Sequence, residues 1–134
     1  MVEEIVRFVT NRKKSMQLSK ELFLEIKKKL EQAMITEKVY LQHDLSMYQL
    51  AKELKTNTSY LSRIIKETYC MSFNTYLNSY RVNEVKRLMK HPKYNDYTID
   101  AISKECGFKN KSTFNKAFRN ITGLTPNEYR KQRI

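Results

Sequence analysis

Two stretches of the chain, SYLSRIIK (residues 59–66) and KSTFNKAFR (residues 111–119), combine short hydroxyl and amide side chains with cations. Arginine and lysine can donate hydrogen bonds to the edge of guanine, asparagine can pair with adenine through two bonds, and serine permits close approach. The spacing of these residues places them on one face of a helix, which is cationic and free of acid. The face is formed by Ser59, Ser62, Arg63 and Lys66 in the first stretch and by Lys111, Ser112, Asn115, Lys116 and Arg119 in the second.

The plainer interpretation of each face is a solvated helix surface with incidental charges. Two faces of matching polarity argue against it, since another charged segment, EIKKKLEQ (residues 25–32), mixes both signs. Enzymatic chemistry is not indicated, because the sequence has no Ser-His-Asp or Cys-His arrangement, metal cluster or glycine-rich phosphate loop. We therefore expect no catalytic residue, no metal, no cofactor and no small-molecule ligand. His43 and Asp44 are interpreted as a turn pair, and Cys70 and Cys106 as small buried hydrophobic residues.

Apolar residues opposite the two polar faces predict a helix in each stretch. Leu61, Ile64 and Ile65 recur at spacings of three and four, as do Phe114, Ala117 and Phe118. Asn57 and Asn110 precede these stripes and are good caps for the two helices. A shorter helix is expected before each one, starting at Ser46, with a capping box completed by Gln49, and at Thr98. A helix, a short turn and a second helix with a polar face form the helix-turn-helix arrangement, whose second helix enters the major groove.

The two arrangements are copies of one unit. AKEL (51–54) matches SKEC (103–106), SYLSRIIK (59–66) matches STFNKAFR (112–119), and CMSFNTYL (70–77) matches GLTPNEYR (123–130). The second copy has one additional residue between its first two helices. Gly107, expected to end the first helix of this copy in a left-handed conformation, aligns with Lys55, which suggests that glycine is not required there.

A long helix is predicted between the copies. Ser72 is its expected cap and Pro92 lies just beyond its end. Its length of about 27 Å approaches one turn of B-DNA, ~34 Å, so the helix could place two reading helices in successive major grooves. A last helix is expected to begin at the capping box formed by residues 125–128.

The composition favours an all-α fold, because only two glycines and two prolines occur among 134 residues. A further stripe, formed by Leu22, Ile26, Leu30 and Ala33 or Met34, predicts an N-terminal helix against the first copy. The expected organisation is a leader or remnant of an upstream linker (1–19), an N-terminal helix (20–38), a first helix-turn-helix subdomain (39–71), a linker helix (72–91) and a second helix-turn-helix subdomain (92–134).

The net charge of +12 and the sequence pI near 9.7 indicate a surface that attracts phosphate polymers or anionic membranes. Charge alone does not separate a sequence-specific DNA-binding protein from a non-specific nucleic-acid or anionic membrane-surface binding module. No apolar run reaches the length of a membrane span and no signal peptide is evident, so a cytoplasmic protein is expected.

The sequence also resembles the bacterial AraC/XylS transcription regulators. The resemblance covers about residues 38–131 and includes the pattern GF-x3-S-x-F-x3-F-x4-G-x-TP-x2-YR, which runs from Gly107 to Arg130, together with SFNTYLNSYR (72–81). It implies a homeodomain-like domain of seven helices, with two helix-turn-helix subdomains joined by a linker helix. The departures are Cys70 and Lys55, where the family usually has glycine.

The resemblance further implies double-stranded DNA as the partner, with RNA polymerase as a further one. Family members usually carry a sensory or dimerisation domain, for which residues 1–38 are too few. The expected base contacts come from Ser59, Ser62, Arg63, Lys111, Ser112, Asn115 and Lys116. The expected contacts to the DNA backbone come from Asn57, Lys66, Lys109, Asn110 and Arg119.

Overall fold

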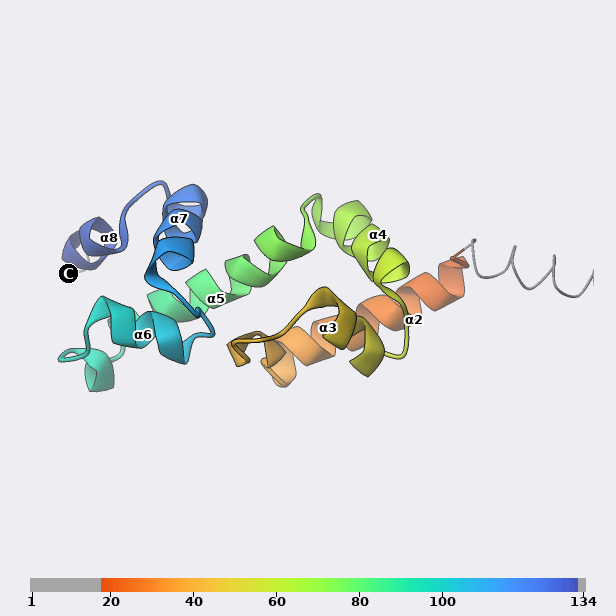
Figure 1. Ribbon diagram of the computed structural model, residues 1–134, viewed down its shortest axis with the longest axis horizontal. Coiled ribbons are helices and arrows are strands. Elements are labelled where there is room, and N and C mark those ends of the chain that lie inside the picture. The colour runs from red at the N-terminus through yellow and green to blue at the C-terminus, as the bar shows by residue number, and fades with distance from the viewer. Residues whose placement is uncertain (1–17, 133–134) are drawn as a thin grey trace, which may run out of the picture.

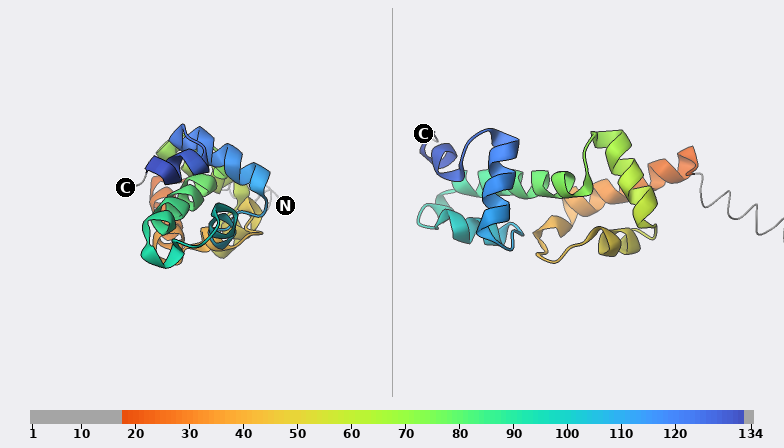
Figure 2. Two further views of the ribbon diagram at one scale, coloured as in Figure 1. Left: turned by 90° about the vertical axis from the view of Figure 1, so that its left-hand side faces the viewer. Right: turned by 45° about the horizontal axis from the view of Figure 1, so that its top comes forward.

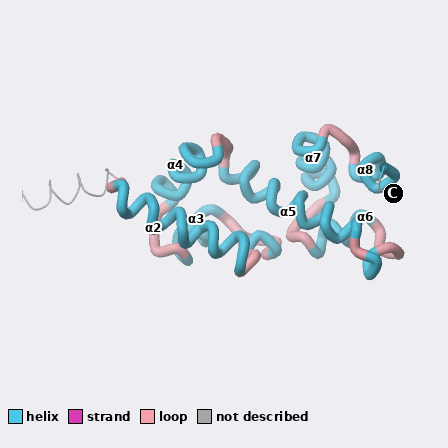
Figure 3. The backbone as a smooth tube through the Cα atoms, turned by 180° about the vertical axis from the view of Figure 1, so that it is seen from behind, coloured by secondary structure: helices cyan, strands magenta, loops and turns pink. Residues whose placement is uncertain are grey.

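The computed structural model describes residues 18–132, and every regular element in this range is helical (Figures 1 and 3). The predicted all-α class is confirmed. Residues 1–17, which make up most of the expected leader, lie outside the described part of the chain.

The first helix of the described range is α2 (Lys20–Glu31), which packs on α4 (Thr58–Tyr69) of the N-terminal half. Ser19 caps it by accepting a hydrogen bond from the amide of Leu22 at 3.1 Å, and a π-helical turn, η1 (Gln32–Thr36), continues it. The predicted apolar stripe is buried from Ile26 onward. Leu22 was also expected in the stripe, but its side chain is 36% exposed, because it lies one turn before the buried contacts begin.

A short segment, residues 38–44, leads from α2 into the first helix-turn-helix unit, and we call it the junction loop. It begins at Lys38, whose φ of 51° is left-handed, and contains the short 3-10 helix η2 (Val39–Leu41). The side chains of Val39 and Tyr40 are buried. The junction loop thus connects α2 to the first helix-turn-helix unit, and its two buried side chains hold it against the core.

The first helix-turn-helix unit consists of α3 (Met47–Glu53) and α4 (Thr58–Tyr69). Ser46 and Gln49 form the predicted capping box at α3, and Asn57 caps α4. Helix α4 packs on α3, on α2 and on the next helix of the chain. Their common core includes Leu30, Met34, Leu50, Leu61, Ile65 and Leu77.

Helix α5 (Phe73–Lys90) has 18 residues and belongs to both halves of the molecule. Ser72 caps it as predicted. Tyr76 and Leu77 near its start lie in the first core, while Val82, Val85 and Met89 lie in a second core. The change from one core to the other falls at residue 81.

The second helix-turn-helix unit consists of α6 (Ile99–Glu105) and α7 (Lys111–Thr122), preceded by the 3-10 helix η3 (Pro92–Tyr94) and followed by α8 (Pro126–Gln132). Thr98 caps α6, Asn110 caps α7, and Thr125 with Glu128 forms the predicted capping box at α8. Phe108, Phe114 and Phe118 fill the centre of the second core.

The two units lie near opposite ends of α5, and α4 and α7 lie on the same side of it (Figures 1 and 2). Helices α3 and α6 lie toward the other side in the view of Figure 1. The arrangement presents the second helix of each unit in the same general direction.

Candidate nucleic-acid interface

The side chains of all twelve predicted contact residues are exposed. Asn57, Ser59, Ser62, Arg63 and Lys66 lie on or just before α4, and Lys109, Asn110, Lys111, Ser112, Asn115, Lys116 and Arg119 lie on or just before α7. Each helix is held from the opposite side by its apolar stripe, in which Leu61, Ile64, Phe114 and Phe118 are at most 1% exposed. Both helices therefore present a polar face to solvent while their opposite face is buried in a core.

The polar face of α4 is not free of acid, contrary to the expectation from the sequence. Arg63 Nε donates to Glu67 Oε1 at 2.9 Å, an ion pair between residues one helical turn apart. The two side chains are each 51% exposed, so solvent weakens the pair. Breaking this pair would therefore cost little free energy.

The polar face of α7 contains no acidic residue and borders an open groove of about 1000 Å³. The groove lies between α7 and the N-terminal ends of α6 and α8, and Lys111, Lys116, Arg119 and Arg130 contribute cations to its wall. Asp100 also lines it and is paired with Lys104 at 3.4 Å. The second unit thus offers a more cationic surface than the first.

The turns of the two units use the same cap. The side-chain oxygen of Asn57 accepts from the amide of Tyr60 at 2.8 Å, and that of Asn110 accepts from Thr113 at 2.8 Å. Since the oxygen is used for capping, a contact from either residue to a phosphate would come from its NH2 group. The cap also fixes the first turn of each helix, which holds Ser59 or Ser112.

Lys109, predicted to contact the DNA backbone, forms an ion pair with Asp44 of the junction loop at 2.5 Å. Its hydrogen bond and charge lower the pKa of the Asp44 carboxyl from its usual value. Both side chains are largely exposed. Lys109 therefore links the turn of the second unit to the N-terminal half of the chain.

A side chain at position 107 would force the backbone around it to shift, which corrects the expectation, based on Lys55, that glycine is not needed there. Both residues have positive φ, 58° at Lys55 and 101° at Gly107. A Cβ atom at Gly107 would lie 2.3 Å from the carbonyl oxygen of Tyr40 and 2.6 Å from Nε of Arg81. No ordinary Cβ contact is that short, so a side chain here would require the junction loop or the turn to move.

The sequence did not indicate the residues that surround Gly107. Arg81 and Glu84 are buried on α5, with 7% and 6% of their surface exposed. The signal that could have revealed them is a pair of charged residues in helical phase with the buried residues Leu77, Val85 and Leu88. A charge in such a stripe needs a specific partner.

Burial of Glu84 raises the pKa of its carboxyl, but hydrogen bonds from Arg87, Lys38 and Tyr40 lower it more, so that the net shift is downward. The Tyr40 hydroxyl donates to Glu84 Oε2 at 3.1 Å and Lys38 Nζ donates to the same oxygen at 3.3 Å. Burial, followed by the charge of Glu84, raises the pKa of the Tyr40 hydroxyl. Glu84 is therefore ionised and Tyr40 is a neutral donor at neutral pH.

The cysteines lie in different environments. Cys106 is buried as expected, and burial raises the pKa of its thiol to about 12. Cys70 is exposed, because it ends α4 in the left-handed conformation and its side chain points away from the core. Among residues 18–132 no group of three His, Cys, Asp or Glu side chains could hold a metal ion. In the same range, no helix combines the length and the apolar character needed to cross a membrane.

Comparison with known proteins decides the family. A family model described as a helix-turn-helix domain matches residues 50–132, which include both α4 and α7. The chain belongs to the AraC-type helix-turn-helix family. As an AraC-type domain it is a DNA-binding module and not an enzyme.

The AraC-type fold is shared with solved structures. The C-terminal domain of AraT, a response regulator from Geobacillus stearothermophilus, is 27% identical with a TM-score of 0.66, over 88% of this chain and 89% of that one. An AraC-type transcriptional regulator from Chromobacterium violaceum has the same fold at 24% identity and a TM-score of 0.66, over 79% of this chain and 92% of that one.

AraC-type relatives are also found by sequence. An HTH-type transcriptional regulator from Bacillus subtilis is 30% identical over 92 residues, which are 69% of this chain and 12% of that protein. The chain spans between 12% and 31% of the length of this and three further regulators that it matches.

Proposed function

We propose that this chain is a sequence-specific, double-stranded DNA-binding domain of a transcription regulator, with α4 and α7 in successive major grooves. The observation that carries the proposal is the placement of α4 and α7, each with an exposed polar face, on the same side of α5 and near its two ends (Figure 1). Each face has the residue types that read base edges. The 18 residues of α5 span about 27 Å, which suits two sites about one turn apart.

The proposed base contacts divide between two grooves. Ser59, Ser62 and Arg63 on α4 would read the first, and Lys111, Ser112, Asn115 and Lys116 on α7 the second. Asn57, Lys66, Lys109, Asn110 and Arg119 would contact phosphates beside them. Arg130, which lines the groove next to α7, donates to the carbonyls of Tyr94, Asn95 and Tyr97 and so supports the surface from behind.

Selection of bound duplexes from a random pool, at two salt concentrations, tests the proposal directly. We expect an enriched site of two parts whose centres lie about 10 base pairs apart. Overall affinity should fall steeply with salt while the preferred sequence stays the same, because phosphate neutralisation depends on salt and base contacts much less. A pool without enrichment, or equal binding to vesicles of anionic lipid, would instead indicate a non-specific or membrane-surface module.

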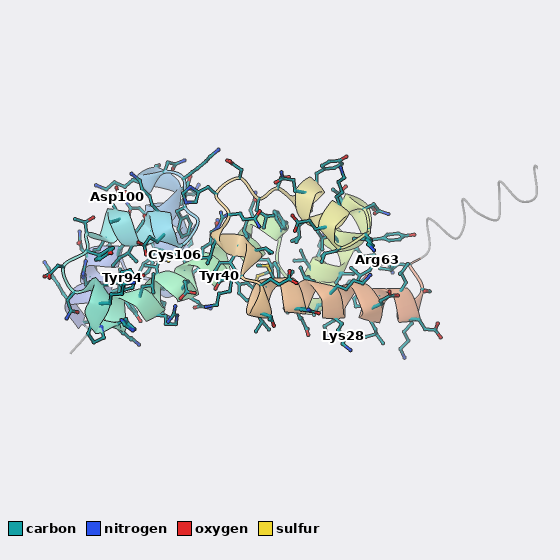
Figure 4. The ribbon with its side chains drawn as sticks, turned by 90° about the horizontal axis from the view of Figure 1, so that it is seen from below. Lys28, Tyr40, Arg63, Tyr94, Asp100 and Cys106 are labelled. Atoms are coloured by element: carbon teal, nitrogen blue, oxygen red, sulfur yellow. The ribbon has the colours of Figure 1, made fainter. Side chains whose placement is uncertain are left out.

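Arg63→Ala and Lys116→Ala test the assignment of the two grooves. Each change should weaken binding by about 1–3 kcal/mol and relax base preference at a few positions only, in different parts of the site. Lys28→Ala is the matched control, because Lys28 is an exposed cation on α2, outside both helix-turn-helix units (Figure 4). It should leave base preference unchanged. Identical site preferences in wild type and both variants would contradict the contact assignment.

A further inference from the structure

Arg81 lies where the two hydrophobic cores meet on α5. The residues before it, Leu77 and Tyr80, pack in or against the first core, and Val82 directly after it belongs to the second. Arg81 is only 7% exposed, and burial lowers the pKa of its guanidinium. An arginine nonetheless stays protonated in proteins, so a cation is held between the two halves of the molecule.

The Arg81 guanidinium is bonded to the junction loop. Its Nε donates to the carbonyl oxygen of Tyr40 and its Nη2 to that of Gln42, each at 2.7 Å. Its Cζ also lies 5.9 Å from the centre of the Phe108 ring, which belongs to the second core. One side chain therefore contacts the N-terminal half through hydrogen bonds and the C-terminal half through an aromatic ring.

The second helix-turn-helix unit closes on the same point. Gly107, in the turn before α7, packs so closely on the Tyr40 carbonyl and Arg81 that no Cβ fits. Figure 4 shows Tyr40 and Cys106, the residue before Gly107, near each other where the two halves meet. Tyr40 thus contacts α5 and the turn of the second unit at once.

Polar contacts of three side chains, His43, Asp44 and Glu84, surround this centre. His43 Nε2 donates to the carbonyl of Lys104 at 2.6 Å, and Asp44 pairs with Lys109. Glu84 accepts from Tyr40 and Lys38 and pairs with Arg87. The junction loop is therefore tied to α5, to the end of α6 and to the turn before α7, which leaves the second unit little freedom to rotate about α5.

We propose that Arg81 is a positioning residue that, with Gly107 and the junction loop, holds α4 and α7 at one separation and one rotational phase, so that the domain selects DNA by the spacing of two half-sites. This inference rests on the proposed function, since it requires a site of two parts. Base contacts on α4 and α7 would determine which sequences are read, and the contacts around Arg81 would determine how far apart they must be.

The test uses the selected two-part site in duplexes with one or two base pairs inserted or deleted between its parts. One base pair moves the second part by about 3.4 Å and rotates it by about 34°. A rigid pair of helices cannot follow this change, so we expect wild type to lose about tenfold or more in affinity, the loss typical of a mismatched base pair.

Arg81→Met keeps an unbranched side chain for packing and removes both hydrogen bonds to the junction loop. We expect the loss caused by a one-base-pair change of spacing to fall to about twofold, because a flexible connection lets each unit follow its own half-site. Base substitutions inside each half-site should cost as much as in wild type. An unfolded or damaged reading helix would lose that discrimination, so the two measurements separate positioning from general damage.

Lys90→Met is the matched control, because Lys90 is an exposed cation on the same helix, away from Arg81. It should keep the full spacing penalty. If Arg81→Met does not fold, the double variant His43→Ala/Asp44→Ala, which removes two exposed contacts and leaves Arg81 in place, should relax the spacing penalty in the same direction.

A folded variant that keeps the wild-type penalty would overturn the inference. So would a wild-type protein that selects a two-part site but tolerates any spacing, although the proposed function would then stand. Failure of wild type to select a two-part site at all would count against the proposed function itself.

Discussion

At the scale of single residues, two separate properties limit which amino acids a position accepts: its backbone conformation and the space around its Cβ atom. Gly107 and Gly123 both have positive φ, 101° and 79°. A Cβ at Gly123 would meet no atom within 4 Å, whereas at Gly107 it would overlap a backbone oxygen. A side chain at position 123 is therefore disfavoured by backbone conformation alone. A side chain at position 107 is disfavoured by backbone conformation and by contact.

This difference predicts unequal effects of the same substitution. Gly123→Ala should lower the free energy of unfolding by about 1 kcal/mol, the usual cost of a left-handed residue with a side chain. Gly107→Ala should cost about 1–3 kcal/mol more, because the turn must also move away from Tyr40. Denaturant unfolding of both variants measures the difference. Equal destabilisation would show that the turn at position 107 moves away from Tyr40 without a cost in free energy.

At the scale of elements, most starts of helices were predictable from the sequence and most contacts between helices were not. Ser46, Asn57, Ser72, Thr98 and Asn110 all cap the helices expected to follow them, because capping involves residues three positions apart. The exposed polar faces of α4 and α7 followed from helical periodicity in the same way.

Such local patterns do not predict contacts between segments that are far apart in the sequence. Arg81 reaches Tyr40 across 41 residues, and Lys109 is paired with Asp44 across the boundary between the units. The exposed Cys70 was wrongly expected to be buried, since its environment depends on how α4 ends. For the same reason, the need for glycine at position 107 could not be deduced from its counterpart Lys55.

The end of α4 offers a test at this scale. Cys70 has φ 58° and ψ 36°, which is strained for a residue with a Cβ, and its side chain is exposed. Cys70→Gly should therefore raise the free energy of unfolding by about 0.5–1 kcal/mol. Cys70→Ser keeps the Cβ and should be nearly neutral. A Cys70→Gly variant that unfolds at lower denaturant than wild type would show that the cysteine makes a stabilising contact.

At the scale of the whole molecule, the charges are divided between surface and interior. Cations face solvent on α4 and α7, while the carboxylate of Glu84 is buried beside the junction loop. Glu84 is 6% exposed and has Lys38, Arg87 and the Tyr40 hydroxyl as partners. Because those partners hold its pKa below the usual 4.5, the ionised carboxylate stabilises the folded state.

This arrangement predicts a loss of stability in acid. The contribution of Glu84 should be complete above pH 4.5 and should disappear as the pH falls through the lower pKa of the folded state. In Glu84→Gln the contribution is absent at every pH, so the two proteins should differ most at neutral pH and converge in acid. Glu53→Gln, on the exposed surface of α3, controls for the change in net charge. A difference that stays constant down to pH 2 would contradict the role of the carboxylate.

The close approach at Gly107 also limits how such a duplicated domain can be re-engineered. The residues that face solvent on α7 can be exchanged for those of α4 without touching the junction. A chimera that repeats the whole first unit in the second place would put the lysine of position 55 against the Tyr40 carbonyl. The two copies are thus not interchangeable at one backbone position, and a design that alters the exposed face of α7 has to leave the turn before it unchanged.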